Sequence, residues 1–213
     1  KDPYRIFVSE MMLQQTSTAS VMNKYESFLK KWPNFEALAK ANQNDVVAMW
    51  QGLGYNRRAI WTKTIAERVF NEFDGELPQD EKTLRKFKGI GEATSGEICA
   101  FAFNKPVVIV NEVNIKRVYI YFFFLDAEPG YVRNGDLKPV IERTNYTEEP
   151  RIWYYALMDY GVMLKAKFPK IHKKSSTYKK QSKFEGSNRQ LRGRILRYMI
   201  KHKRATAEEV ALS

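Results

Sequence analysis

The chain has 213 residues, of which 44% are hydrophobic and 14% aromatic, and its formal net charge is +12. This composition excludes wholesale disorder, and the length suffices for one or two domains with hydrophobic cores. No apolar run approaches the ~18 residues that a membrane span requires, so we expect no membrane partner. The single cysteine excludes an internal disulfide framework and a metal site built from several cysteines.

The excess positive charge lies in one segment. Residues 1–164 carry 21 basic and 21 acidic side chains, whereas residues 165–204 carry 15 basic residues and one acid, Glu185. A positive run of this kind favours a polyanion as partner, because phosphate contacts release counterions. A solvated basic linker is the alternative interpretation.

Apolar residues at helical spacing predict a succession of helices up to residue 165. The first is expected over residues 6–29 and ends before the Trp32-Pro33 step, because a residue that precedes proline is pushed out of the α region. The one competing strand is the β-branched run 107–110, which we expect to be a buried extended link, so the predicted fold class is all-α. The other helices are expected over residues 35–40, 45–51, 56–73, 80–88, 92–103, 114–125, 137–144 and 151–165.

The pattern changes after the last of these helices. The lysine-rich stretch 165–187 lacks apolar periodicity and is expected to be a linker on the surface. An amphipathic helix is expected to begin at Asn188, and Thr206 resembles an N-cap over the two glutamates that follow it. We interpret residues 188–213 as the start of a helix-turn-helix or winged-helix-like unit.

A glycine turn lies between two of the predicted helices. Gly89 and Gly91 flank Ile90 and permit a sharp turn with exposed backbone amides. The next helix begins at once, so its free N–H groups and the positive end of its dipole form an anion site suited to a DNA phosphate. An ordinary turn between helices is the alternative interpretation.

This segment, a helix followed by Gly-Ile-Gly and a second helix, resembles the helix–hairpin–helix of the base-excision DNA glycosylases related to endonuclease III and MutY. Further blocks that resemble this family follow in family order at residues 2–4, 9–16, 50–55, 57–59, 114–118 and 156–161. The resemblance implies a two-lobed, all-α HhH-GPD glycosylase fold with the active site in the cleft between the lobes. It places residues 17–104 in a helical barrel lobe with the hairpin, and residues 1–16 and 105–183 in the second lobe.

Glu10 is the candidate general acid. It stands in the apolar stretch 7–13 with no cation one turn away, so its carboxyl is expected to be desolvated and its pKa raised. An acid that works at neutral pH requires such a shift. From the residues alone, a buried glutamate paired with an arginine elsewhere in the chain is the alternative. The resemblance implies that this position protonates the departing base.

Glu112 is the candidate second carboxylate, and here the sequence departs from the family. The family has Asp two residues before the residue that matches Asn114, whereas this chain has Glu, whose carboxylate reaches ~1.5 Å further. A fixed negative charge beneath the sugar stabilises an oxocarbenium-like state, and we assign this role to Glu112. A helix N-terminal glutamate that favours the dipole, with Asn114 as the cap, is the other interpretation and is compatible with the first.

Two features of the family are expected to be absent. Bifunctional relatives carry a lysine soon after the hairpin glycines, whose amine forms a Schiff base, but the matching residue here is Ala93. Relatives often end this domain with four cysteines that hold an iron–sulfur cluster, whereas residues 165–182 contain no Cys. We therefore expect no cofactor. A monovalent cation bound at the hairpin is compatible with this expectation. Cys99 is expected to be an inert buried thiol, and His172 and His202 are expected to be surface residues.

The resemblance also implies which residues contact DNA. Gln15, Leu53 and Tyr55 lie on the two loops that resemble the family's intercalating elements; simple exposure for Gln15 and burial in a core for the other two are the alternatives. Arg57 and Arg58 are expected to meet phosphates or to form a solvated helix face. The full set of expected DNA contacts is Gln15, Thr16, Leu53, Gly54, Tyr55, Arg57, Arg58, Gly89, Gly91, Ala93, Thr94 and Asn114.

Together these features predict a monofunctional DNA glycosylase of base-excision repair, which hydrolyses the N-glycosidic bond of a flipped base and leaves an abasic site. The resemblance favours adenine, mispaired with guanine or 8-oxoguanine. The alternatives are a glycosylase for uracil, thymine or another damaged base, and a non-catalytic helix–hairpin–helix DNA-binding protein. The expected partner is double-stranded DNA with a mismatch or lesion, bound by a monomer in the bacterial cytoplasm at the nucleoid or, in a eukaryote, in the nucleus.

Overall fold

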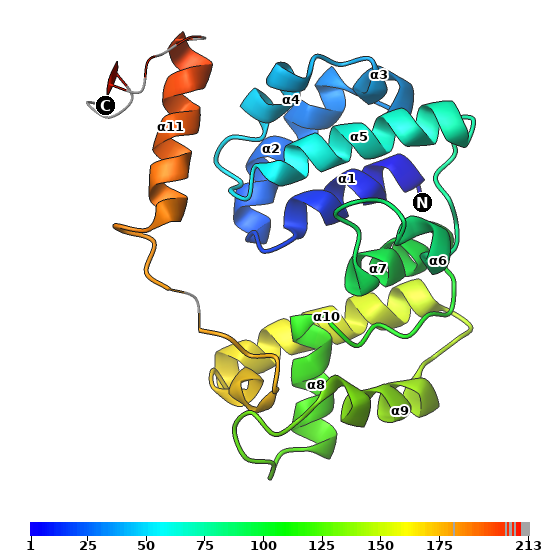
Figure 1. Cartoon of the computed structure of the whole chain (residues 1–213). Coiled ribbons are helices and arrows are strands. Elements are labelled where there is room, and N and C mark those ends of the chain that lie inside the picture. The colour runs from blue at the N-terminus through cyan, green and yellow to red at the C-terminus, as the bar shows by residue number, and fades with distance from the viewer. Residues whose placement is uncertain (181, 203, 205, 207, 210–213) are drawn as a thin grey trace. The chain divides into compact units, whose positions relative to one another are not determined.

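The structure is a computed structural model that describes residues 1–180, 182–202, 204, 206, 208 and 209 (Figure 1). Across these residues the chain forms eleven α-helices, one short 3₁₀ helix and no strand beyond an isolated bridge between Val132 and Ser175, which confirms the all-α class. None of the helices in these ranges is long and apolar enough to cross a membrane. The elements are α1 Pro3–Leu13, α2 Thr18–Lys31, α3 Phe35–Ala39, α4 Gln43–Met49, α5 Arg57–Glu72, α6 Glu81–Leu84, α7 Glu92–Phe103, α8 Val113–Phe123, α9 Asn134–Thr144, α10 Pro150–Lys167, the 3₁₀ helix η1 Ile171–Lys174 and α11 Asn188–His202.

The predicted helix over residues 6–29 is two helices in the structure, so this prediction is wrong. α1 ends at Leu13 and α2 begins at Thr18. Ser17 lies in the break with an extended backbone, and its side chain accepts a hydrogen bond from the amide of Ser20 at 3.3 Å. Such a cap satisfies one free amide of the first helical turn and competes with a continuous helix. The run of hydroxyl residues at this point is the sequence signal that outweighs the apolar spacing.

The chain divides into two compact units. Unit 1 comprises residues 1–11 and 76–179, and unit 2 comprises residues 12–75 together with the described residues from 180 onward. These units do not coincide with the lobes that the family resemblance implies, since residues 76–104 cluster with unit 1. The units are defined by how compactly the residues pack, whereas the predicted lobes are defined by resemblance to the family. The units therefore do not test the lobe boundaries, which stay a prediction.

Unit 1 is built on the packing of α8 against α10, which cross in Figure 1. Residues 107–110 form the buried extended link that the sequence predicts, with Ile109 and Val110 both buried. Tyr154 of α10 holds this link, because its hydroxyl donates to the carbonyl of Val107 at 2.6 Å and accepts from the amide of Ile109 at 3.2 Å. The core around it includes Ala100, Phe101, Ile115, Val118, Tyr119, Ile120, Leu137, Ile141, Leu157 and Leu164.

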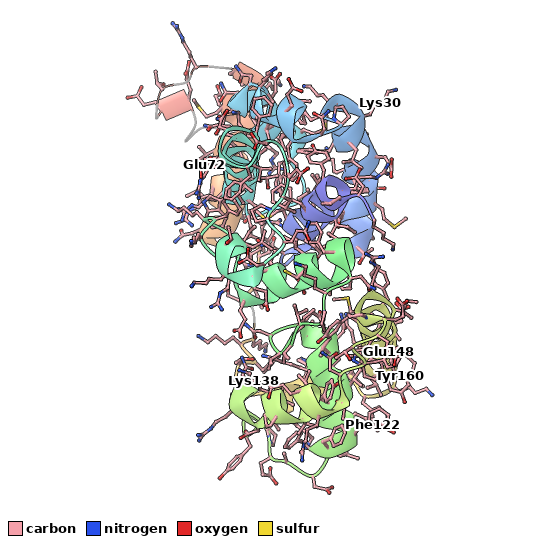
Figure 2. The ribbon with its side chains drawn as sticks, turned by 90° about the vertical axis from the view of Figure 1, so that its right-hand side faces the viewer. Lys30, Glu72, Phe122, Lys138, Glu148 and Tyr160 are labelled. Carbon is pink, nitrogen blue, oxygen red and sulfur yellow. The ribbon has the colours of Figure 1, made fainter. Side chains whose placement is uncertain are left out.

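Gly161 permits the close approach of α10 to the first turn of α8. A Cβ built on this residue would lie 2.6 Å from the Cβ of Asn114 and closer still to its backbone oxygen. Only a residue without a side chain fits there. The same two helices also meet through Phe122 and Tyr160, whose rings stack with centroids 5.7 Å apart (Figure 2). The start of α8 is therefore held in place by α10.

Unit 2 packs α3 and α4 against α5 around an aromatic core. Phe28 of α2 meets Trp32 and Trp50 edge-on, with ring centroids 4.9 and 6.1 Å apart. Edge-to-face pairs of this kind stabilise a core beyond the area that they bury. Other buried side chains of this unit are Leu38, Val46, Ile65 and Val69.

Arg58 joins two loops of unit 2 from a buried place at the start of α5, where its exposed fraction is 3%. Its guanidinium donates to the backbone carbonyl of Met12 at 2.7 Å and to the hydroxyl of Thr16 at 2.7 Å. It also donates to the carbonyls of Leu53 and Gly54, at 3.1 and 2.9 Å. The arginine is therefore an internal cross-link between the loop after α1 and the loop before α5.

The basic tail contains the helix that the sequence predicts from residue 188. α11 buries none of its residues. Its exposed apolar side chains are Leu191, Ile195 and Met199. Thr206 and Glu209 form the expected reciprocal cap, since each accepts a hydrogen bond from the other's amide through its side chain. The rest of the predicted winged-helix-like unit, at residues 203, 205, 207 and 210–213, lies outside the described residues.

Gly161→Ala is expected to lower the free energy of unfolding by about 1–3 kcal/mol, because the added Cβ meets backbone rather than a flexible side chain. Urea denaturation measures the change. Gly135→Ala in α9 is the control, since nothing lies within 4 Å of a Cβ at that position. The control should leave stability unchanged or raise it by up to ~1 kcal/mol. Equal stability of the two variants would contradict the close contact.

Arg58→Met should cost about 1–3 kcal/mol of unfolding free energy, because buried carbonyls lose their donor. Arg57→Met changes an exposed neighbour and should stay within about 0.5 kcal/mol of the wild type. The same denaturation experiment compares the pair. A loss shared equally by both variants would show that Arg58 is not the cross-link.

Candidate active site

Glu112 is the N-cap of α8. Its backbone is extended, and its Oε2 accepts hydrogen bonds from the amides of Asn114 at 2.5 Å and Ile115 at 2.8 Å. These amides are free donors at the helix N-terminus, and a carboxylate there also faces the positive end of the helix dipole. The interpretation in which Asn114 caps this helix is therefore wrong, because the cap is Glu112 itself.

Asn114 and Arg117 complete the surroundings of this carboxylate. Asn114 Nδ2 donates to Glu112 Oε1 at 3.1 Å, and Asn114 Oδ1 accepts from the guanidinium of Arg117. Burial raises the pKa of Glu112, and the amide hydrogen bonds and the charge of Arg117 oppose that rise. Both carboxylate oxygens are thus oriented by the chain's own hydrogen bonds, which is the preorganisation that electrostatic stabilisation of a cation requires.

Glu10 lies on α1 next to the buried Met11 and is itself only partly exposed. Burial raises its pKa to about 7, the negative charge of Glu112 adds to the rise, and a hydrogen bond from Ser9 Oγ at 3.4 Å opposes it. No arginine in the described part of the chain partners it. A general acid must be protonated at the working pH and must also release its proton easily. A carboxyl whose pKa lies near that pH meets both requirements. This agrees with the desolvation expected from the apolar neighbours of Glu10.

A third carboxyl, Glu97, lies within electrostatic reach of these two, and the sequence prediction missed it. It lies on α7, where all the residues from 94 to 102 except Glu97 itself are buried. Burial raises the pKa of Glu97 well above its usual range, and the negative charges of Glu10 and Glu112 raise it further. The sequence signal that could have identified Glu97 is that it is the only charged residue between positions 93 and 104.

The glycine hairpin precedes the same helix, as predicted. Gly89 has a φ of +100°, a conformation that favours glycine. Gly91 is the exposed N-cap of α7 and, as a glycine, has no side chain with which to cap the helix. The anion site expected at the start of α7 stays a prediction. Ala93 stands in this turn and carries no amine.

The two loops expected to contact DNA belong to unit 2. Gln15 and Tyr55 are exposed and have positive φ angles of +53° and +46°, a strained backbone that non-glycine residues often keep at functional sites. Leu53 is 4% exposed and packs as a core residue, and Arg57 is exposed. The expected phosphate contact is wrong for Arg58, because its guanidinium is buried and bonded to backbone carbonyls.

Cys99 is buried, and burial raises the pKa of its thiol to about 12, which suits an inert thiol. It is the chain's one cysteine, so the chain does not supply the four thiolates of an iron–sulfur cluster. Within the described ranges, no group of three or more His, Cys, Asp or Glu side chains could hold a metal ion. The monovalent cation at the hairpin stays a prediction. His172 is half-buried against the ring of Tyr178, and His202 is exposed.

Comparison with known proteins identifies a family and individual relatives of this chain. Residues 8–134 match the family model of the HhH-GPD superfamily base excision DNA repair protein. The chain is 32% identical over 164 residues to the adenine DNA glycosylase of Buchnera aphidicola subsp. Baizongia pistaciae. This match covers 77% of this chain and 46% of that protein. The chain is 36% identical over 128 residues to the adenine DNA glycosylase of Homo sapiens, with coverage of 60% and 23%. The chain thus spans less than half the length of these curated relatives.

Solved structures share the fold. A thermostable thymine-DNA glycosylase superposes with a TM-score of 0.65 at 25% identity, over 76% of this chain and 75% of that one. A trapped endonuclease III–DNA covalent intermediate superposes with a TM-score of 0.64 at 17% identity, over 75% of this chain and 74% of that one. Since the family model covers more than half of the sequence and the fold agrees, the chain belongs to the HhH-GPD superfamily of base excision DNA repair proteins.

Proposed function

We propose that this chain acts as a monofunctional DNA glycosylase in base-excision repair, on adenine mispaired with guanine or 8-oxoguanine. The observation that carries the proposal is the pair of carboxyls in unit 1. Glu10 has a pKa of about 7 and lies within electrostatic reach of Glu112, whose own oxygens are held at the start of α8. Two carboxyl groups in different environments are the arrangement by which glycosidic bonds are hydrolysed. The adenine glycosylases among the relatives support adenine as the base.

In the proposed reaction, Glu10 donates its proton to a ring nitrogen of the flipped base. The C1′–N bond breaks and its electron pair leaves with the base, so positive charge develops on the sugar. Glu112 stabilises this charge with a carboxylate that is already oriented. A water oxygen then adds to C1′, and the proton that it releases returns to the carboxyls. The net reaction consumes one water and leaves an abasic site.

Double-stranded DNA with a mismatch or lesion is the partner that we infer, bound by a monomer in the compartment of the chromosome, either the nucleoid or the nucleus. The glycine turn that ends at Gly91, the exposed N-cap of α7, supports a phosphate contact. The exposed Gln15, Tyr55 and Arg57 support contacts from the loops of unit 2. The basic run 165–204 supports attraction to the DNA backbone.

A non-catalytic DNA-binding protein and a glycosylase for another base are the rival functions. A binding protein has no use for a desolvated acid beside a second carboxylate, so Glu10 and Glu112 favour an enzyme. Fold similarity to a thymine-DNA glycosylase keeps thymine and uracil among the substrates to test. A panel of duplexes with A, U, T, 8-oxoguanine or an alkylated purine, each opposite several partners, separates these functions. Release of adenine from mispairs alone is the expected result.

Glu10→Gln is expected to slow single-turnover adenine release by ~10²–10⁴-fold, because an amide keeps the shape of the side chain but donates no acidic proton. Strand cleavage by hot alkali after incubation with an A·8-oxoguanine duplex measures the release. Glu128→Gln changes an exposed carboxyl of the same unit and should match the wild type. Thermal unfolding of each variant checks the fold. Activity that survives Glu10→Gln would remove this residue as the acid.

The product strand should stay intact until alkali is added, because Ala93 supplies no amine for a Schiff base. Borohydride added during the reaction should likewise trap no covalent protein–DNA complex. Endonuclease III, which forms a covalent intermediate with DNA, is the positive control for trapping. Strand scission without alkali, or a trapped complex, would show a lyase activity that this proposal excludes.

A further inference from the structure

Part of the lysine-rich stretch after α10 is bound to the fold. The 3₁₀ helix η1 packs against α8, and its Ile171 is buried. The residues that follow pair with the loop after α8. The amide of Val132 donates to the carbonyl of Lys174 at 2.9 Å, and the amide of Ser176 donates to the carbonyl of Val132 at 2.8 Å. Residues 171–177, which we call the strap, therefore belong to unit 1 and are not the linker that the sequence predicts.

Lys116 joins the strap to the residue before Glu112. It lies in the first turn of α8, and its exposed fraction is 6%. Its Nζ donates to Oδ1 of Asn111 at 2.8 Å and to the hydroxyl of Thr177 at 2.8 Å. An ammonium group that is removed from water needs such acceptors, and burial lowers the pKa of Lys116. Lys116 is therefore a bridge between the strap and the residues that lead into α8.

This bridge acts on a stretch that packing does not enclose. Asn111 and Val113 are exposed on either side of Glu112. Two backbone amides of α8 hold the carboxylate of Glu112, but they do not fix the chain that enters the cap. The hydrogen bond from Lys116 ties Asn111 back to α8. The backbone on the N-terminal side of Glu112 is thus restrained by a hydrogen bond from a buried group.

The strap orients Thr177 for this contact. Its Oγ1 lies 3.0 Å from the hydroxyl of Ser175, and its amide donates to the same hydroxyl at 3.4 Å. Ser175 is itself buried and forms the bridge with Val132. Because the Thr177 hydroxyl accepts from Lys116, its own proton is available to donate to Ser175. The acceptor for Lys116 is therefore held by the buried part of the strap.

We propose that Lys116 and Thr177 are positioning residues that hold Glu112 beneath the sugar of the flipped base. The inference rests on the proposed glycosylase function. A glutamate has one more rotatable bond than an aspartate, so the place of its carboxylate depends more strongly on how its backbone is held. A carboxylate that shifts away from the developing positive charge stabilises it less. The strap thus contributes to the reaction although it does not touch the base or the sugar.

The first test is Thr177→Val, which removes the acceptor and keeps both the charge and the approximate shape of the side chain. Single-turnover adenine release from an A·8-oxoguanine duplex is expected to slow by roughly 3–10-fold, because Glu112 is less well held. The rate constant reports on folded molecules, whereas a variant that only loses stability lowers the amplitude of the reaction. A rate constant equal to that of the wild type would overturn the proposal.

DNA affinity separates positioning from binding. The probe is the same duplex with a fluorine at C2′ of the adenosine, which resists hydrolysis because it disfavours positive charge on the sugar. The affinity of Thr177→Val for this probe should stay within about twofold of the wild type, since the bridge acts on the chemical step. A loss of affinity as large as the loss of rate would assign the strap to DNA binding and overturn the positioning role.

Two matched variants control for a general effect on the strap. Thr177→Ser keeps the hydroxyl and should release adenine at a rate within about twofold of the wild type. Ser176→Ala changes the exposed neighbour, which bonds to Val132 through its backbone amide, and should match the wild type. Slowing by Ser176→Ala to the same extent as by Thr177→Val would contradict the specific role of Thr177.

A double-variant cycle tests whether the two residues act together. Lys116→Met keeps the apolar stem of the side chain and removes its donors, and it should slow release by about tenfold or more. Adding Thr177→Val to Lys116→Met should cause less than about twofold further loss, because the bridge is already broken. Losses that multiply would show that the two residues act independently and would overturn the proposal.

The second test needs no activity. The amides of Asn114 and Ile115 donate to Glu112, so their hydrogen exchange reports on how firmly the cap is held. In Thr177→Val both amides are expected to exchange roughly threefold faster or more, whereas the amides of α5 in unit 2 keep their rates. Nuclear magnetic resonance measures each amide separately. Unchanged exchange at both amides would contradict the proposed bridge.

The two readouts separate the two ways to fail. A wild type that releases no base from any duplex contradicts the proposed function, and the exchange experiment still decides whether the strap holds the cap of α8. Adenine release that is equally fast in the wild type and Thr177→Val contradicts the inference about the strap and leaves the glycosylase function standing.

Discussion

The partial burial of three carboxyl groups within one unit is the constraint on which the rest of the site depends. A carboxylate in such surroundings is costly unless hydrogen bonds or a proton compensate it. The fold compensates Glu112 with two backbone amides and the side-chain amide of Asn114. Glu10 and Glu97 lack such a set and have raised pKa values instead. The cost of burying a charge is therefore met in two ways: hydrogen bonds stabilise Glu112 as an anion, whereas Glu10 and Glu97 hold their protons to a higher pH.

A rigid frame keeps these carboxyls in their places. The first turn of α8 is held by the contact with Gly161 of α10, and the extended link before it by the hydroxyl of Tyr154. On the other side of that link, Gly96 lets α7 approach Ile109. Two glycines and one tyrosine, none of them a group that performs chemistry, thus determine where the chemistry can take place.

Arg58 shows how a basic residue in a segment that was expected to contact DNA can serve the fold instead. Its guanidinium has five N–H donors in a fixed plane, which suits several carbonyls as well as it suits a phosphate. In unit 2 the carbonyls of Met12, Leu53 and Gly54 occupy it. The strained backbone of Gln15 and Tyr55 lies on the loops that this cross-link connects. Its neighbour Arg57 is the exposed basic residue of the pair.

Local patterns in the sequence were enough to predict most of the helices, the all-α class, the buried link over residues 107–110 and the desolvation of Glu10. Each depends on residues within a few positions of one another, whose spacing is visible along the chain. The break at Ser17 is also local, but apolar spacing obscured it.

Tertiary structure alone decided that Arg58 is a buried cross-link and that Glu97 lies within electrostatic reach of the two proposed catalytic carboxyls. These features depend on groups that come from separate segments of the chain, and no periodicity records which segments will meet. Burial and charge repulsion act through space, so the third carboxyl became visible only once α1, α7 and the start of α8 were folded in unit 1.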